Sequence, residues 1–285
     1  MKRYRKNLTE NHIKALLVVS RLVNATVKAV CTAFDSPAEN HYRGYLNDLA
    51  LDGFLYKKTI YGIAQTGKNG INLGTLYAMT QKGAELLQDS DMVDGEIYHY
   101  KDGIKAKSPI QALHRIQLVH VLALLLQAET RGKMRVLDIV PYFQKRGALV
   151  LGESKATATA QTESGLIVPD ALVRLEVGGK IRVIAIELHR ATPTTRILSQ
   201  LSKHTETIES GEFSRYFGEN GLSFVCSIHE QESTLKNTIQ RRNEIADFER
   251  FSKGFHFTLL DDLFLKGFEN AFYMTNGEKS RLFQG

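Results

Sequence analysis

Two acidic residues, Asp170 and Glu187, are spaced so that they could share a divalent cation. Between them, Gly178-Gly179 separates two apolar-rich runs. This predicts a β-hairpin with a two-residue turn, because both glycines can adopt positive φ. If Val177 pairs with Lys180, Asp170 pairs with Glu187 in the same register. Directly opposed residues share a face, with Cβ atoms roughly 4.5–5.5 Å apart. A cation such as Mg²⁺ or Mn²⁺ would remove the repulsion between the two carboxylates.

His189 lies two residues beyond Glu187, so both side chains are expected on one face of the strand. A histidine there would add a polar group to the two acids. Strands of soluble proteins also carry acidic residues at their exposed ends, so an acidic face without a metal is the alternative interpretation.

The hairpin belongs to a segment in which short apolar runs alternate with helical stretches. Strands are expected at residues 166–168, 171–177, 181–188 and 222–227, and a helix is expected at 193–209. Earlier, Pro109 begins a long helix, and residues 136–146 are expected to form a second helix or helix-like piece. The pattern indicates a mixed α/β domain. P-loop, G-x-G-x-x-G and G-x-S-x-G motifs are absent from the sequence.

The N-terminal third has a different pattern. Residues 9–34 are helical in periodicity, Asp35-Ser36-Pro37 breaks the chain, and another helix ends at Gly53. Two strands are expected next, at 54–61 and 73–79, and Thr80 caps a further helix. A polar, weakly patterned stretch follows. We therefore predict a first domain at 1–90, a linker at 91–108 and a second domain at 109–285.

This order of helices followed by a two-stranded wing resembles a winged helix-turn-helix, on residues 43–55 and 76–83. In such domains one helix enters the DNA major groove and the wing touches the backbone. The resemblance implies that the helix contacts DNA through Asn40, His41 and Arg43, and that the wing contacts phosphate through Lys57, Lys58 and Lys68. The same fold also serves protein–protein contacts, which is the alternative.

Composition is compatible with a DNA-binding protein. The net charge is +6 and the sequence pI is about 9.1, which suits an anionic partner. Only Cys31 and Cys226 occur, so a zinc site or disulfide framework is not expected. The apolar run at 118–126 is too short to cross a bilayer, and the basic N-terminus lacks an apolar signal core. We predict a cytoplasmic protein that does not contact a membrane.

Pro169-Asp170, the hairpin, Glu187-Leu188-His189 and the following helix resemble the PD-(D/E)xK nuclease-like core. The resemblance implies an α/β (α+β) fold in which a winged helix-turn-helix precedes a restriction-endonuclease-like mixed sheet. In that superfamily an Asp and a Glu hold the metal, and a Lys two residues after the Glu assists the attacking water. Here His189 replaces this lysine. A histidine can ligate metal or move protons near neutral pH, but it carries no permanent charge.

Most of the chain also resembles the replication-relaxation family, which includes the C class of plasmid mobilisation relaxases. The resemblance is carried by the winged helix, residues 113–118, Pro169-Asp170-Ala171 and residues 187–192. The family pattern is close to Glu-x-Asp-Arg-Gly-Thr, so Arg190 and Thr192 match while His189 and Ala191 differ. The resemblance implies metal-dependent nicking of double-stranded DNA at a transfer origin, together with other mobilisation proteins, with a homodimer left open.

In this account Asp170, Glu187 and the Leu188 carbonyl hold Mg²⁺ or Mn²⁺, and His189 orients or deprotonates the nucleophile. Phosphate charge is stabilised by Arg190, Arg196 and Lys203, although helical Arg and Lys are often merely solvated. Three residues are weaker candidates: Glu153 and Glu163 as further acidic ligands, and Tyr216 as an alternative nucleophile. Two other functions are left open. One is a non-catalytic DNA-binding accessory or regulator, and the other is an unrelated α/β protein that uses its winged helix for protein contacts.

Overall fold

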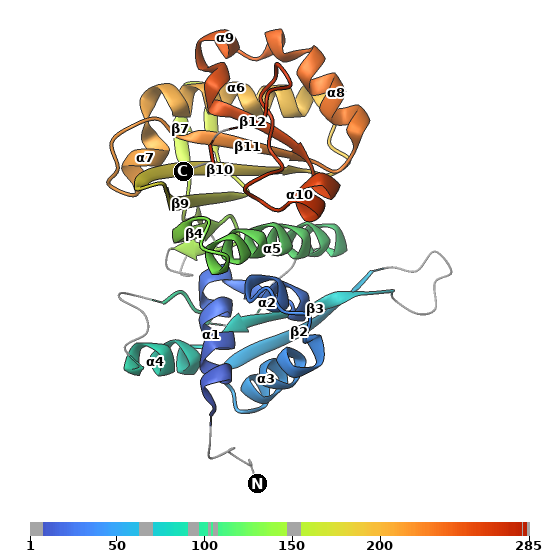
Figure 1. The fold of residues 1–285 in the computed structure, drawn as a ribbon, viewed down its shortest axis with the longest axis vertical. Helices are drawn as coiled ribbons and strands as arrows, with labels where there is room; N and C mark the ends of the chain where they lie inside the picture. Colours follow the sequence, from blue (N-terminus) through green and yellow to red (C-terminus); the bar gives the residue numbers. More distant parts are fainter. Residues whose placement is uncertain are drawn as a thin grey trace. The chain divides into compact units, whose positions relative to one another are not determined.

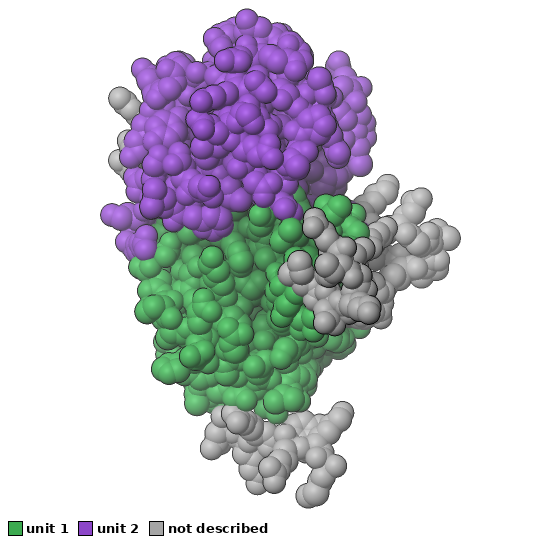
Figure 2. Space-filling view, turned by 90° about the vertical axis from the view of Figure 1, so that its right-hand side faces the viewer, with its two compact units in different colours: residues 1–130 green, residues 131–285 purple. Residues whose placement is uncertain are grey.

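The fold is of the mixed α+β class, as predicted, in a computed structural model that describes residues 8–62, 71–90, 97–101, 104, 108–146, 155–280 and 282–283 (Figure 1). The chain divides into two compact units, Met1–Thr130 and Arg131–Gly285, which Figure 2 colours green and purple. Lys68 and Glu153, two of the predicted functional residues, lie outside the described residues. Each unit has its own β-sheet and is described by itself.

Unit 1 combines a small sheet with helices. Its elements are α1 (Glu10–Leu22), β1 (Asn24–Ala25), α2 (Val27–Ala33), α3 (Glu39–Leu51), β2 (Leu55–Gly62), β3 (Ile71–Met79), α4 (Gln81–Asp89) and α5 (Pro109–Thr130). The strands are ordered β1-β3-β2, and both pairs are antiparallel. The helical stretch predicted at 9–34 is two helices, because Val23 adopts a φ of 64° and Asn24 pairs with Ala78 in the sheet.

Local capping fixes the ends of two helices in this unit. The Thr26 hydroxyl accepts a hydrogen bond from the Ala29 amide at the start of α2. The Thr80 hydroxyl accepts one from the Gly83 amide at the start of α4, as the sequence predicts. Gly83 also permits close packing, since a Cβ there would lie 2.3 Å from the Phe54 carbonyl oxygen.

Helix α5 is a core helix of unit 1. Ala112 and Ile116 pack with Ile60 and Leu76 of the sheet, and α5 also packs on α2. The division between units therefore falls after Thr130, further along the chain than the predicted linker at 91–108. Among the described residues, α5 alone has the length and hydropathy to cross a membrane. However, 61% of its most apolar window is buried, as in the core of a soluble protein.

Unit 2 is built on a five-stranded sheet with the order β12-β11-β10-β9-β4. The elements that form and cover it are β4 (Arg135–Pro141), β9 (Ala171–Val177), β10 (Lys180–His189), α6 (Thr194–Ser210), α7 (Glu212–Tyr216), β11 (Phe224–His229), α8 (Glu232–Gln240), α9 (Phe248–Phe251), β12 (Phe255–Leu259) and α10 (Leu260–Lys266). Short hairpins pair β5 (Lys145–Arg146) with β6 (Lys155–Ala156) and β7 (Ala160–Thr162) with β8 (Gly165–Ile167). The helix predicted at 136–146 is wrong, because residues 135–141 form a strand that pairs with β9.

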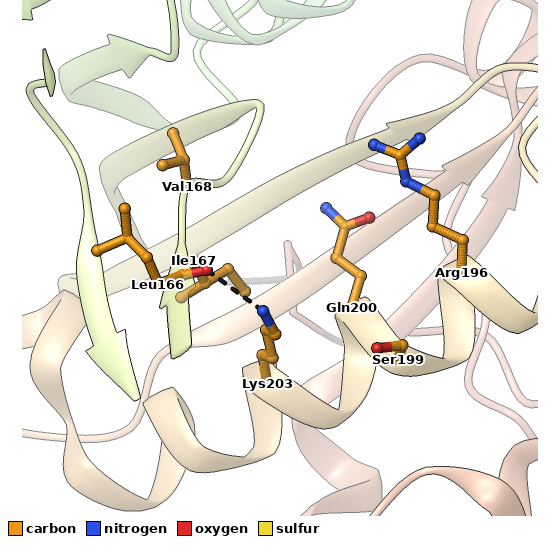
Figure 3. Close-up of a pocket in the computed structure, with 7 residues that line it drawn as sticks. All are labelled: Leu166, Ile167, Val168, Arg196, Ser199, Gln200 and Lys203. Atoms are coloured by element: carbon orange, nitrogen blue, oxygen red, sulfur yellow. Dashed lines mark hydrogen bonds between the residues drawn. The ribbon is translucent and has the colours of Figure 1, made fainter. Parts of the chain in front are cut away.

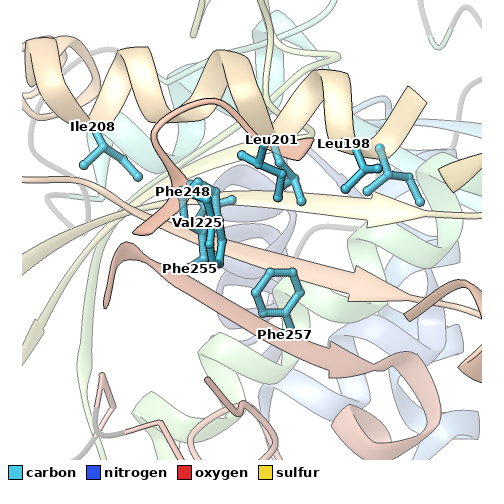
Figure 4. Packing of buried hydrophobic residues seen from close by; sticks show 9 residues of the cluster. Leu198, Leu201, Ile208, Val225, Phe248, Phe255 and Phe257 are labelled. Carbon is cyan, nitrogen blue, oxygen red and sulfur yellow. The ribbon is translucent and has the colours of Figure 1, made fainter. Parts of the chain in front are cut away.

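Helix α6 covers one face of this sheet. It connects β10 to β11, which run parallel, so it is a crossover helix of the kind parallel strands require. Leu198, Leu201 and Ile208 of α6 pack on Val225 and Phe257 of the strands, and Figure 4 shows this cluster. The packing fixes α6 above the strand that carries Glu187 and His189.

Candidate functional site

The turn between β9 and β10 sets the predicted register. Gly178 and Gly179 have φ values of 56° and 73°, and Val177 pairs with Lys180. The ladder continues to Ala171 paired with Ile186, so Asp170 and Glu187 are the next positions in register. The Asp170 carboxylate accepts a hydrogen bond of 2.7 Å from the Leu188 amide. The predicted register of the hairpin is therefore confirmed.

Glu187 is 1% exposed and both of its carboxyl oxygens have partners. Oε1 lies 2.6 Å from Nε2 of His204, and Oε2 accepts a hydrogen bond from the Gln200 amide. Burial and the nearby Asp170 raise the pKa of Glu187 well above its usual value, against the opposing effect of Gln200. Burial lowers the pKa of His204 to about 3. Both shifts favour the neutral forms of the two groups.

His189 is buried beside a second histidine, at 4% exposure. Its Nε2 lies 3.1 Å from the Ser227 hydroxyl, which in turn lies 2.9 Å from Nε2 of His229. The parallel register pairs Glu187 with Ser227 and His189 with His229, so this chain continues the polar row that Glu187 begins. Burial lowers the pKa of His229 to about 4. His189 is thus part of a buried hydrogen-bonded chain.

A pocket of about 240 Å³ includes Gln200, the residue that donates to Glu187. Arg196, Ser199, Gln200 and Lys203 of α6 line one side, and residues 166–168 line the other (Figure 3). The four α6 side chains follow the spacing of one helix face. Gln200 belongs to both places, since it lines the pocket and donates to Glu187. Arg196 and Lys203 therefore lie on the same helix face as Gln200, the pocket residue that contacts Glu187.

The cations differ in their partners. Arg190 pairs with Glu230 at 3.4 Å, whereas the Lys203 ammonium donates to the Leu166 carbonyl oxygen at 3.4 Å. Neither Arg196 nor Lys203 forms an ion pair with a carboxylate within the described parts of the chain. The pocket is thus lined by two positively charged side chains that form no ion pair with a carboxylate of the described residues.

Those predicted DNA-contact residues of unit 1 that the structure describes are exposed. Asn40, His41 and Arg43 lie on the surface of α3, where Arg43 approaches Glu39 at 3.7 Å. The Lys57 ammonium donates to Asn47 Oδ1 at 2.8 Å, so it lies beside α3. The neighbouring Lys58 donates to the Ile104 carbonyl oxygen at 3.0 Å, as expected for adjacent strand residues that point to opposite faces. The two lysines therefore lie on different sides of strand β2.

The sequence interpretation missed the two α6 residues that hold Glu187. Gln200 and His204 are four residues apart in a helix that was predicted, so they were available as a polar pair on one helix face. The weaker candidates are not brought to the acids by any described contact. Glu163 is exposed in the β7–β8 turn, and Tyr216 is 38% exposed in α7.

Within the described residues, no group of three or more His, Cys, Asp or Glu side chains is arranged to hold a metal ion. The oxygen donors that come together are the carboxyl groups of Asp170 and Glu187. Comparison of the chain with family models, with curated proteins and with solved structures found no match.

Proposed function

We propose that this chain is a cytoplasmic DNA-processing protein of the relaxase type, in which unit 1 binds duplex DNA and unit 2 nicks one strand. The observation that carries the proposal is the meeting of Asp170 and Glu187 beside a pocket lined by Arg196 and Lys203. Acidic oxygens next to cations suit a phosphodiester, because the cations bind phosphate while the acids bind a metal ion.

Unit 1 supports DNA binding through its topology. A helix–strand–helix–helix–hairpin order with the sheet β1-β3-β2 is what a winged helix requires, and α3 presents exposed polar and basic residues. Arg43 and Lys57 are the basic side chains on or beside α3 that would reach phosphate.

The backbone near the acids also supports the relaxase-type resemblance. Ala191 adopts a φ of 44°, in the left-handed region that favours glycine. The family pattern has glycine at this position, followed by a threonine that corresponds to Thr192. The Thr192 hydroxyl donates to the Arg190 carbonyl oxygen, which closes the turn after β10.

The acidic pair fits a hard cation such as Mg²⁺ or Mn²⁺. Its donors are oxygens, and a cation would favour the ionised form of Glu187, which burial and the nearby Asp170 disfavour. Asp170, Glu187 and the Leu188 carbonyl would hold the ion. When bound, the ion supplies charge stabilisation on phosphate and a lowered pKa for a bound water. Gln200 orients Glu187, and Arg196 and Lys203 hold phosphate oxygens.

A nicking assay tests this function. Supercoiled plasmid that carries the cognate origin should be converted to open circles by the wild type with Mg²⁺ or Mn²⁺, and Asp170→Ala should abolish the conversion. Glu176→Gln is the matched control, because it removes a carboxylate at a half-exposed position of β9, the strand that Asp170 immediately precedes. Identical activity of the wild type and Asp170→Ala would exclude catalysis by this site.

A second candidate function is a non-catalytic DNA-binding accessory or regulator. It is favoured by one observation: both Glu187 oxygens are already held by His204 and Gln200, and His189 is buried with Ser227. This candidate predicts salt-dependent DNA binding without nicking by any variant. Under either function, partner mobilisation proteins would meet the protein on origin DNA.

A further inference from the structure

The pocket beside α6 has two chemically different walls. One wall carries Arg196 and Lys203, seven residues apart on the same helix face. The other wall is formed by residues 166–168, where Leu166 is 55% exposed, Ile167 is buried and Val168 is half-buried. Figure 3 shows the α6 row of polar side chains across from this apolar segment. Such a combination suits a ligand with a charged end and a flat or apolar end.

The α6 wall carries two cations of the kinds that bind phosphate, Arg196 at one end of the row and Lys203 two helical turns further along. Arginine matches phosphate oxygens with a planar fork of donors, and lysine adds a point charge. Arg196 also lies in the first turn of α6, a helix of 17 residues whose N-terminal amides favour an anion. Its guanidinium has no carboxylate partner among the described residues. A phosphate would therefore meet cations whose charge is not already paired.

The apolar wall is held in place by α6 itself. Glu206 of α6 accepts hydrogen bonds from the Ser164 amide at 3.2 Å and from the Ser164 hydroxyl, in the turn between β7 and β8. Lys203 donates to the Leu166 carbonyl oxygen, which ties the strand to the same helix. The two walls thus form one preformed unit, and Leu166 presents apolar surface at its edge.

We propose that this pocket binds a single nucleotide, with its phosphate on Arg196 and Lys203 and its nucleoside against Leu166 and Val168. The volume of about 240 Å³ lies below the roughly 300–1,000 Å³ of pockets for drug-sized ligands, which favours one nucleotide over two. Ser199 and Gln200 supply the hydrogen-bonding groups between the two walls. This inference deepens the proposed function on which it rests, because it names the group that the same site would receive.

Calorimetric titration of the full chain tests the inference with four probes: thymidine 5′-monophosphate, thymidine, inorganic phosphate and the oligonucleotide (dT)4. The monophosphate should bind at least about tenfold more tightly than thymidine or phosphate, since only it uses both walls. Arg196→Gln/Lys203→Gln should weaken its binding by about tenfold or more, because two charge-assisted hydrogen bonds to phosphate are removed. Leu166→Ser should weaken monophosphate binding and leave phosphate binding unchanged.

The charge-matched control is Lys236→Gln/Arg241→Gln, which removes two cations from exposed positions of unit 2 outside the pocket. It should bind the monophosphate as the wild type does. Tighter binding of (dT)4 than of the monophosphate identifies a DNA strand as the source of the nucleotide, and equal or weaker binding of (dT)4 identifies the free nucleotide. Monophosphate that binds no better than phosphate, or that binds the double variant like the wild type, overturns the inference.

The two proposals fail in different ways. Monophosphate binding without nicking removes the nicking function and leaves the nucleotide pocket in place. Nicking without monophosphate binding removes the pocket assignment alone. Circular dichroism of each variant shows that its fold is retained, and the surface positions of Arg196 and Leu166 favour that result.

Discussion

Glu187 is a buried acid whose two carboxyl oxygens are both hydrogen-bonded within the fold. A buried carboxyl group needs partners for both oxygens, because an unpaired polar atom in an apolar interior costs free energy. His204 and Gln200 supply them from α6, and burial, together with the nearby Asp170, raises the pKa of Glu187. A bound cation would favour the ionised form of this carboxyl group. Burial also lowers the pKa values of His204 and His229, which favours their neutral forms.

A histidine of unit 1 gives a pH-dependent prediction that is independent of the acidic pair. His120 Nε2 lies 2.8 Å from the Thr26 hydroxyl, and burial, together with Lys28, lowers the pKa of His120 to about 4. An unfolded histidine, with a pKa of about 6.5, takes up a proton that the folded one refuses, so the free energy of unfolding should fall as pH drops from 6.5 to 4. The full effect is about 3 kcal/mol.

Urea unfolding at several pH values measures this effect. His120→Gln should show a shallower fall in the free energy of unfolding between pH 6.5 and 4 than the wild type, because the replaced group does not titrate. The matched control is His41→Gln, which makes the same replacement on the exposed face of α3. An unchanged pH dependence in His120→Gln would contradict a partly buried, neutral histidine at this position.

At the scale of elements, tight turns and close backbone contacts determine strand register and helix packing more than helix propensity does. The β9–β10 hairpin takes its register from two glycines with positive φ, and α4 packs closely because Gly83 has no side chain. Replacement of a helical glycine by alanine should therefore lower stability where the glycine is closely packed and raise it where the glycine is exposed.

Gly83→Ala and Gly44→Ala form such a pair. At Gly83 a Cβ would lie 2.3 Å from the Phe54 carbonyl oxygen and 2.6 Å from Met79 Sδ, so we expect a loss of roughly 1–3 kcal/mol. Gly44 lies exposed in α3 with no atom within 4 Å of a Cβ, so alanine should stabilise unit 1 by roughly 0.5–1 kcal/mol. Chemical denaturation measures both. Changes of the same sign would argue against the packing of α4.

The parts of the fold that could be predicted were local ones. Gly178-Gly179 specifies its hairpin within a few residues, and the register that it fixes brings Asp170 to Glu187. Residues 136–146 were predicted to be helical, but the first part of this stretch, up to Pro141, pairs with β9, which is distant in the sequence and which local pattern does not encode. Gln200 and His204 were missed for the same reason, since their role depends on a strand that the helix packs against.

At the scale of the whole molecule, two units with different chemistry lie on one basic chain. The net charge of +6 suits a polyanion, and each unit presents its own cations, on α3 and β2 in unit 1 and on α6 in unit 2. If unit 1 supplies duplex affinity and unit 2 acts on phosphate, changes in the wing should alter binding without removing the acidic site.

The salt dependence of duplex binding tests the role of the wing. Replacement of Lys57, Lys58 and Lys68 by glutamine should weaken binding and reduce the slope of log K against log salt, by up to about 0.9 for each phosphate that a lysine no longer neutralises. Lys14→Gln, on the exposed side of α1, is the control. An unchanged slope in the triple variant would rule out contact between these lysines and DNA.

The central claim is that Asp170 and Glu187 form a metal site that acts on DNA phosphate. Anomalous diffraction from crystals soaked in Mn²⁺ tests it most directly. We expect a peak between the two carboxylates, with Glu187 turned from at least one of its present partners on α6. The absence of a peak there, with Glu187 still bound to both His204 and Gln200, would contradict the claim.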